Sequence, residues 1–325
     1  MVCLYVTSIE EGAGRTMLCA GLGKHLRDNG KKLGYFKPVI GEQPSGATGD
    51  HDALFMKQVL GLAEDADIIS PVFADKEKLA GGIREAYARV ASGKDVVITE
   101  ALFQPALMAE LDARVVAVES YQVAGMKTAD TYLELGEQLL GLVLNKVPVN
   151  KLGLIRDDTL AGGDILAVLP EDRVLYALSI GELAERLQGE ILNSAEQSGE
   201  IVANIMIGAM VVDPGPEYFG RKSQKAVVVR GDRPDMQLAA LETPTGCLIL
   251  CGNTPPIHTV LYEAEKRKVP VILVPGDIKN TVASIEDVLE RSRFNQPKKL
   301  TRLTELMGKN FGFGALYQGL GLSQA

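Results

Sequence analysis

The stretch CLYVTSIEEGAGRT, which runs from Cys3 to Thr16, decides how the rest of the chain is interpreted. An apolar run enters a loop of small residues, and the loop opens a segment with helical periodicity. Gly12 and Gly14 allow successive backbone N–H groups to turn inward around an anion. A helix that begins near Arg15 adds its N-terminal dipole, which also favours an anion. The stretch therefore predicts a phosphate-binding turn between a strand and a helix.

The loop departs at two positions from the strict motif G-x4-G-K-[ST]. Ile9 stands where the first glycine belongs, and Arg15 stands where the lysine belongs. Arginine keeps the positive charge, but its longer, planar head need not reach the same phosphate oxygens. Thr16 is in the position that places a hydroxyl on Mg²⁺. The alternative interpretation is a tight turn that binds no ligand.

Short apolar runs alternate with helix-length amphipathic stretches along the whole chain. Several runs, such as DVVIT and GLVLN, are continuously apolar, which is typical of parallel strands covered on both faces. We therefore predict an α/β fold with a doubly wound, mostly parallel sheet, followed by a second, smaller α/β domain. The predicted ranges are 1–190 for the first domain, 200–310 for the second and 311–325 for a Gly-rich tail.

Four further residues of the first domain are candidates for the same site. Lys37 follows the second predicted strand, and Asp52 lies with Asp50 just before a predicted helix. Glu100 ends an apolar strand, as a carboxylate that faces Mg²⁺ would. Asn145 ends a later strand, where its amide reads a nucleobase edge or caps a turn. Taken singly, Lys37 is better explained as a solvated lysine. Asp50 and Asp52 are explained at least as well as helix caps, and Glu100 can also be a surface residue.

A second candidate site lies in the second domain, where two loops follow predicted parallel strands. Asp232, Arg233 and Asp235 offer charges of both signs, and Asn253 offers an amide. Loops after parallel strands meet at the carboxyl edge of their sheet, where ligands of α/β folds bind. The alternative is that Pro234 begins a helix and Asp232 caps it.

The composition argues against several classes of function. Acidic residues outnumber basic ones by 42 to 34, for a net charge of −8, so a nucleic-acid-binding surface is not expected. No apolar stretch is long enough to span a membrane, and the N-terminus lacks the basic region of a signal peptide, so we expect a cytoplasmic protein. Four cysteines without a C-x-x-C pair and three histidines give no support to a zinc site.

Taken together, these motifs resemble the dethiobiotin synthetase-like family of P-loop proteins over about residues 1–190. The matching segments are Thr7–Thr16, Tyr35–Pro38, Asp50–Ala53, Val97–Glu100 and Val143–Lys146. The chain is more similar still to the N-terminal part of long phosphotransacetylases. There a DRTGG domain follows, and the strand, G-D-R-P-D turn and helix of residues 228–241 resemble it. No counterpart of the acetyltransferase domain is present in the 325 residues.

The resemblance implies ATP or a similar nucleotide as cofactor, together with Mg²⁺. Gly12, Gly14, Arg15, Lys37 and Asn145 would bind the nucleotide, and Thr16, Asp52 and Glu100 would face the metal. It also implies a homodimer, and a separate acetyltransferase is a candidate partner.

Two functions stay open at this point, beside a structural scaffold that has kept the fold and lost the site. One is a nucleotide or phosphorylated-metabolite sensor with weak or no catalysis, favoured by Arg15 and by the bulky Ala101-Leu102-Phe103 after Glu100. The other is an ATP- and Mg-dependent ligase that activates a carboxylate by phosphorylation.

Overall fold

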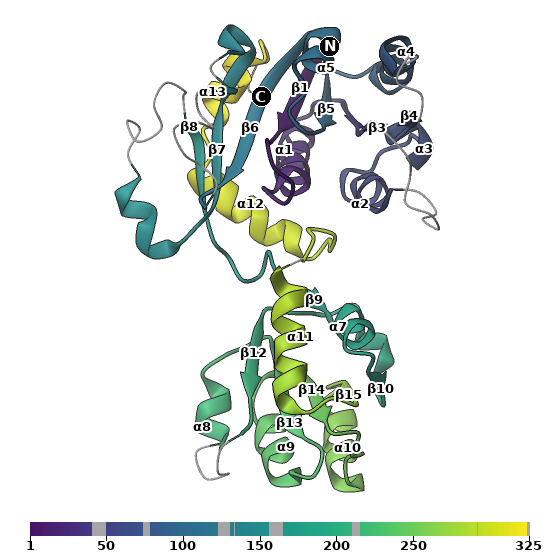
Figure 1. Ribbon diagram of the computed structural model, residues 1–325, viewed down its shortest axis with the longest axis vertical. Coiled ribbons are helices and arrows are strands. Elements are labelled where there is room, and N and C mark those ends of the chain that lie inside the picture. The colour runs from purple at the N-terminus through teal and green to yellow at the C-terminus, as the bar shows by residue number, and fades with distance from the viewer. Residues whose placement is uncertain are drawn as a thin grey trace. The chain divides into compact units, whose positions relative to one another are not determined.

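The computed structural model describes residues 1–40, 50–73, 79–122, 131–132, 134–155, 165–209, 215–290 and 292–323. The chain divides into two compact units (Figure 1). Unit 1 comprises residues 1–171 and 294–325, and unit 2 comprises residues 172–293. The α/β fold with a second, smaller domain is thus confirmed.

Unit 1 is built on a six-stranded sheet in which every neighbouring pair of strands is parallel. The strand order is β2-β5-β1-β6-β7-β8. The strands are β1 (Val2–Thr7), β2 (Leu33–Phe36), β5 (Val96–Glu100), β6 (Ala113–Ser120), β7 (Leu139–Val147) and β8 (Ile165–Pro170). β1 lies inside the sheet between β5 and β6, so the loop that follows it lies at the middle of the carboxyl edge.

Helices cover both faces of this sheet. Side chains alternate along β1, so Cys3 and Tyr5 pack with α4 and α5 while Leu4 and Val6 point to the opposite face, where α1 lies. The helices of unit 1 are α1 (Arg15–Asp28), α2 (His51–Leu60), α3 (Ala66–Ile69), α4 (Leu79–Ala91), α5 (Pro105–Glu110), α12 (Lys299–Asn310) and α13 (Phe313–Gly319). Two short strands, β3 (Val39–Ile40) and β4 (Val72–Phe73), pair with each other, and the 3-10 helices η2 (Gly136–Gln138) and η3 (Val149–Leu154) flank β7.

The last 32 residues belong to unit 1, which differs from the predicted second domain ending at 310 and the predicted tail 311–325. α12 buries Leu300, Leu303, Leu306 and Met307 and packs against α1. Gly21 of α1 permits this approach, because a Cβ there would overlap the Met307 sulfur. The Gly-rich end forms α13 and is anchored where the Phe313 ring stacks on His25, with ring centroids 3.6 Å apart.

Unit 2 is a five-stranded sheet with the order β10-β15-β14-β13-β12. Its strands are β10 (Glu190–Ile191), β12 (Asn204–Ile207), β13 (Lys225–Arg230), β14 (Thr245–Cys251) and β15 (Val271–Leu273). Only β10, at one edge, is antiparallel to its neighbour among these described strands. A small pair, β9 (Leu178–Ser179) with β11 (Ile201–Val202), and the 3-10 helix η4 (Ala195–Gln197) complete the unit.

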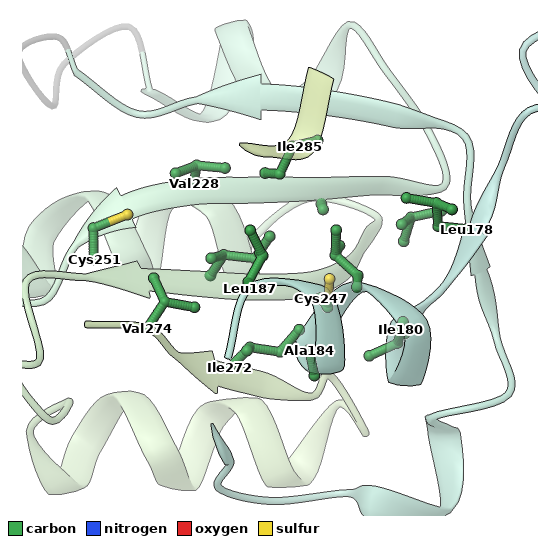
Figure 2. Packing of buried hydrophobic residues seen from close by; sticks show 14 residues of the cluster. Leu178, Ile180, Ala184, Leu187, Val228, Cys247, Cys251, Ile272, Val274 and Ile285 are labelled. Carbon is green, nitrogen blue, oxygen red and sulfur yellow. The ribbon is translucent and has the colours of Figure 1, made fainter. Parts of the chain in front are cut away.

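Each face of the second sheet has its own apolar core. On one face, α7 (Ile180–Arg186) and α11 (Ile278–Glu290) cover Val228, Cys247 and Ile272 (Figure 2). On the other face, α8 (Gly215–Gly220), α9 (Pro234–Leu241) and α10 (His258–Lys266) cover Val227, Val229 and their neighbours. A capping box of Ser179 and Glu182 starts α7, which ends at Arg186.

Candidate functional site

The loop between β1 and α1 has the geometry of an anion-binding turn. Gly12 and Gly14 have φ angles of 76° and 110°, which are conformations that favour glycine. Gly14 is the N-cap of α1 and makes no side-chain cap, so the first-turn N–H groups of α1 lack a capping partner. Within the described residues, the backbone N–H groups of Gly12, Ala13 and Gly14 also donate to no acceptor. The loop thus presents several donors that a phosphate group can accept from.

Asn145, at the end of β7, supports this loop from the side. Its buried amide donates to the carbonyl oxygen of Ala13 at 2.8 Å. A Cβ on Gly14 would overlap the Asn145 amide nitrogen, so only glycine lets the two segments approach this closely. The sequence predicts either base recognition or a turn cap for Asn145, whereas the structure uses its amide to hold the phosphate loop.

Arg15 lies back over the loop that it follows. Its guanidinium donates to the Ser8 hydroxyl, and its Nη1 donates to the Glu10 carbonyl at 3.2 Å. Its Nε is buried without a hydrogen-bond acceptor among the described residues. The arginine that replaces the motif lysine is therefore partly engaged by the loop's own backbone.

Thr16 and Glu100 come together as the sequence predicts. The Thr16 hydroxyl donates to Glu100 Oε1 at 2.7 Å, and the Tyr35 hydroxyl donates to Glu100 Oε2 at 2.7 Å. Glu100 is only 3% exposed, and this burial raises the pKa of its carboxyl, against the opposing charge of Lys37. A strand-terminal surface glutamate is excluded, because both of its oxygens are inside the site.

Lys37 is held between the two aspartates of the next segment. Its ammonium lies 2.9 Å from Asp50 Oδ2 and also contacts Asp52. Burial lowers the pKa of Lys37, but the carboxylates of Glu100, Asp52 and Asp50 outweigh it and raise that pKa to about 12. Asp50 is the N-cap of α2 through the Asp52 N–H, at 2.9 Å. Lys37 opposes the effect of burial on Asp50 and keeps its carboxyl pKa below the usual value.

The oxygen atoms on and beside Thr16 are of the kind that bind a hard cation such as Mg²⁺. Mg²⁺ prefers oxygen ligands, and Thr16, Glu100 and Asp52 supply a hydroxyl and two carboxylates. In the structure the Lys37 ammonium is the cation that contacts Asp52. No group of three or more His, Cys, Asp or Glu residues with metal-binding geometry occurs in the part of the chain that the structure describes. Thr16 and Glu100 could ligate a metal as they lie, whereas Asp52 would first have to leave Lys37.

Glu119 is a site residue that the sequence-based prediction missed. It lies at the end of β6, is fully buried, and accepts from the Ile9 N–H at 2.8 Å and from the Tyr132 hydroxyl. The signal that could have identified it is the same one that identified Glu100, an acid at the end of an apolar strand. Thr7 Oγ1, at the start of the loop, is likewise buried and has no partner among the described residues.

In unit 2 the two predicted loops meet at the carboxyl edge of the sheet. Gly231 follows β13 and lies so close to the Thr254 backbone that a Cβ would overlap it. Arg233 forms a two-pronged pair with Asp235, with Nε to Oδ1 at 2.9 Å and Nη2 to Oδ2 at 2.7 Å. Asn253 lies beside Thr254 in the second loop, with a positive φ of 52°.

The helix-cap interpretation of Asp232 is wrong. The N-cap of α9 is Arg233, without a side-chain cap, and Pro234 is the first helical residue as expected. Asp232 instead pairs with Arg230, whose Nε donates to its Oδ1 at 2.8 Å. The local ion pair turns the Asp232 carboxylate toward the preceding strand end, so it does not reach the helix N–H groups.

Comparison with known proteins identifies both parts of the chain. Residues 182–288 match the DRTGG domain, and residues 3–80 match the AAA domain. Phosphate acetyltransferase of Nitrosomonas europaea is 23% identical over 95% of this chain and 50% of its own length. The ATP-dependent dethiobiotin synthetase BioD of Methanococcus vannielii is 36% identical over 21% of this chain and 30% of its own length. The resemblances that the motifs indicate are thus confirmed.

The chain spans about half the length of the phosphate acetyltransferases that it matches. Among solved structures, the CBS and DRTGG domains of the regulatory region of Clostridium perfringens pyrophosphatase, complexed with diadenosine tetraphosphate, are similar with a TM-score of 0.32 and 17% identity. That likeness covers 38% of this chain and 50% of the other. Among the described helices, none has the length and apolar character that crossing a membrane requires.

Proposed function

We propose that this chain is a regulatory protein that binds a nucleotide or a phosphorylated metabolite at the loop of unit 1, with weak or no catalysis. The proposal rests on one contrast: the backbone N–H donors of the loop lack acceptors, whereas the nearby cations already have protein partners. The N–H groups of Gly12 and Gly14 donate to no acceptor among the described residues, whereas Arg15 and Lys37 are engaged by the protein. Donors that are free support binding, and cations that are already occupied argue against phosphoryl transfer.

Mg²⁺ and ATP, or a similar nucleotide, are the ligands that we propose for this loop. The contact between Thr16 and Glu100 supports a metal on that side, because both oxygens belong to the ligand class that Mg²⁺ prefers. When bound, the ion would neutralise part of the phosphate charge. Asp52 would join as a ligand once it is released from Lys37.

A substitution at Thr16 tests the site. We expect ADP with Mg²⁺ to raise the melting temperature of the wild-type protein, because a ligand that binds only the folded state stabilises it. Thr16→Ala removes the hydroxyl beside the metal position and should reduce that shift. Thr301→Ala, on the exposed side of α12, is the matched control and should leave the shift unchanged. An equal shift in all three proteins would count against this site.

The contact of Thr16 with Glu100 also favours a second function, an ATP- and Mg-dependent ligase of dethiobiotin synthetase type. The two functions differ in turnover. ATP consumption is measured in the presence of each of a panel of small carboxylates. Binding of ATP without its consumption in any of these mixtures supports the regulatory function. Sustained ATP consumption that depends on one carboxylate would replace it with the ligase.

Three further proposals concern partners. We propose a second ligand site at Asp232, Arg233, Asp235 and Asn253 of unit 2, where two loops meet at the edge of the sheet. We also propose that the protein forms a homodimer. Because the matched relatives are phosphate acetyltransferases, we propose a separate acetyltransferase as the protein on which it acts.

A further inference from the structure

Glu119 places a buried carboxylate directly beneath the phosphate loop. Its side chain has no exposed surface, and its Oε1 accepts from the Ile9 N–H and from the Tyr132 hydroxyl. Its Oε2 is buried and has no hydrogen-bond donor among the described residues. Oε1 is therefore satisfied by the loop and by Tyr132, whereas no hydrogen bond from the described residues compensates Oε2 for its lost hydration.

The groups that face Glu119 do not neutralise it fully. Glu10 of the loop is a second acid nearby, Tyr132 is a neutral hydroxyl, and Arg15 is the neighbouring cation. Arg15 is in turn engaged by Ser8 and by the Glu10 carbonyl. Burial raises the pKa of Glu119, the Ile9 N–H and the Tyr132 hydroxyl oppose that rise, and Glu10 adds to it. The carboxylate thus has a poorly stabilised charge before any ligand arrives.

A phosphate group bound in the loop would make the ionised form of Glu119 less favourable. It brings negative charge close to Glu119, and like charges disfavour ionisation of the carboxyl. It also competes with Glu119 for the positive charge of Arg15. Because no described residue donates to Oε2, protonation is the response that removes the unpaired charge.

We propose that the Glu119 carboxyl takes up a proton when a phosphate group binds in the loop, so that phosphate and proton bind together. This inference rests on the proposed function, since it assumes that the loop of unit 1 is a phosphate site. The proton comes from solvent and is held on the Glu119 carboxyl, and no covalent bond of the ligand changes. Glu119 is thus a residue that sets which charge state of a ligand the loop accepts.

Calorimetric titration with inorganic pyrophosphate tests the linkage. Titrations in buffers of different ionisation enthalpy, over about pH 6–9, count the protons taken up on binding. Three proteins are compared: wild type, Glu119→Gln, which keeps the oxygen that accepts from Ile9, and Glu137→Gln. Glu137 is an exposed acid near the opposite end of β6, where its carbonyl accepts from Arg114, so its substitution controls for the loss of one charge.

We expect wild type and Glu137→Gln to take up more protons than Glu119→Gln, with a difference that approaches about one per site where free Glu119 is ionised. Protons exchanged by pyrophosphate itself are common to the three proteins and cancel in the difference. The affinity of wild type relative to Glu119→Gln should fall by up to about tenfold per pH unit between the free and bound pKa of Glu119, and level off above both.

Infrared difference spectra of the wild type give a readout that needs no variant. Pyrophosphate should add the C=O band of a protonated carboxyl, which a purely structural role for Glu119 would not produce. Pyrophosphate binding with equal proton uptake in all three proteins and no such band would overturn the linkage and leave the phosphate site intact. Failure of pyrophosphate to bind the wild type would overturn both the linkage and the site.

Discussion

At the scale of single residues, the site depends on two glycines that differ in what surrounds them. Gly12 and Gly14 both have positive φ, but a Cβ on Gly12 would meet nothing within 4 Å, whereas one on Gly14 would overlap the Asn145 amide. Alanine at position 12 carries only the backbone penalty, roughly 1–2 kcal/mol. Alanine at position 14 adds the displacement of Asn145 and, with it, of the Ala13 carbonyl that Asn145 holds.

We therefore expect Gly14→Ala to abolish the stabilisation of the protein by ADP and to lower its melting temperature more than Gly12→Ala does. Gly12→Ala should keep a measurable part of the ADP effect, because the donors of Ala13 and Gly14 stay in place. Thermal melts of both variants with and without ADP provide the comparison. If both variants lose the response to the same extent, the contact with Asn145 has no part in shaping the loop.

At the scale of helices and strands, the sequence predicts the first sheet well, because its strands are continuously apolar and each ends in a turn. The continuously apolar runs DVVIT and GLVLN, for example, fall on β5 and β7. Continuous burial on both faces is a local pattern, so it can be recognised without tertiary information. The six-residue runs from β1 and β8 illustrate this, with almost every side chain buried or half-buried.

The return of α12 to unit 1 could not be predicted in the same way. Its apolar stripe of Leu303, Leu306 and Met307 indicates an amphipathic helix, but such a stripe does not say which surface it covers. The short antiparallel strand β10 was also missed, because two residues are too few for a periodicity. Glu119 carries the same local signal as Glu100, but its contacts with Ile9 and Tyr132 form only in the folded structure and could not be predicted from the sequence.

The end of β13 and the loop after it, at the carboxyl edge of the second sheet, contain two arginines that can be compared. Arg230 and Arg233 each form an ion pair with the aspartate two residues later. The two arginines therefore have the same kind of partner and can be compared by substitution. Arg233 lies at the start of α9 beside the loop that follows β14. We expect Arg233→Ala to change the response to nucleotides or acyl phosphates while leaving the ligand-free melting temperature almost unchanged, because a surface ion pair contributes little stability.

Arg230→Ala is the matched control for that experiment and should leave the ligand response as it is in wild type. Loss of an N-cap side chain lowers the free energy of unfolding by about 1 kcal/mol. Since Asp232 does not cap α9, Asp232→Ala should not cause this loss. Thermal melts of the three variants with the same ligand panel provide the data. A ligand response that is equal in all variants would leave unit 2 without a site at these residues.

At the scale of the whole molecule, the net charge of −8 and the site's own acids limit what can bind. Among the described residues, the loop region contains more carboxylates than cations. The acids are Glu10, Glu11, Asp50, Asp52, Glu100 and Glu119, and the cations are Arg15 and Lys37. A free phosphate ligand would be repelled unless it arrives with a cation or a proton. A divalent metal beside Thr16 and proton uptake at Glu119, both as proposed above, would be two separate ways to meet that requirement, one on each side of β1.

We expect the protein to assemble as a homodimer. Light scattering at micromolar concentration should give a mass of twice the 34.9 kDa of one chain. The 3-10 helix η3 supplies a surface for such a contact, because Val149 and Leu154 are 68% and 64% exposed on this one short element. Burying such apolar side chains against a partner removes them from water and stabilises the dimer.

Replacing Val149 and Leu154 together by serine should therefore shift the protein toward the single-chain mass, while its far-ultraviolet circular dichroism stays that of the wild type. Substituting the exposed Ile257 and Tyr262 of unit 2 in the same way is the matched control. A wild-type mass of about 35 kDa would contradict the dimer itself. A dimer that survives in the Val149 and Leu154 variant would place its contact elsewhere, since the loss of two apolar side chains from a small interface weakens association measurably.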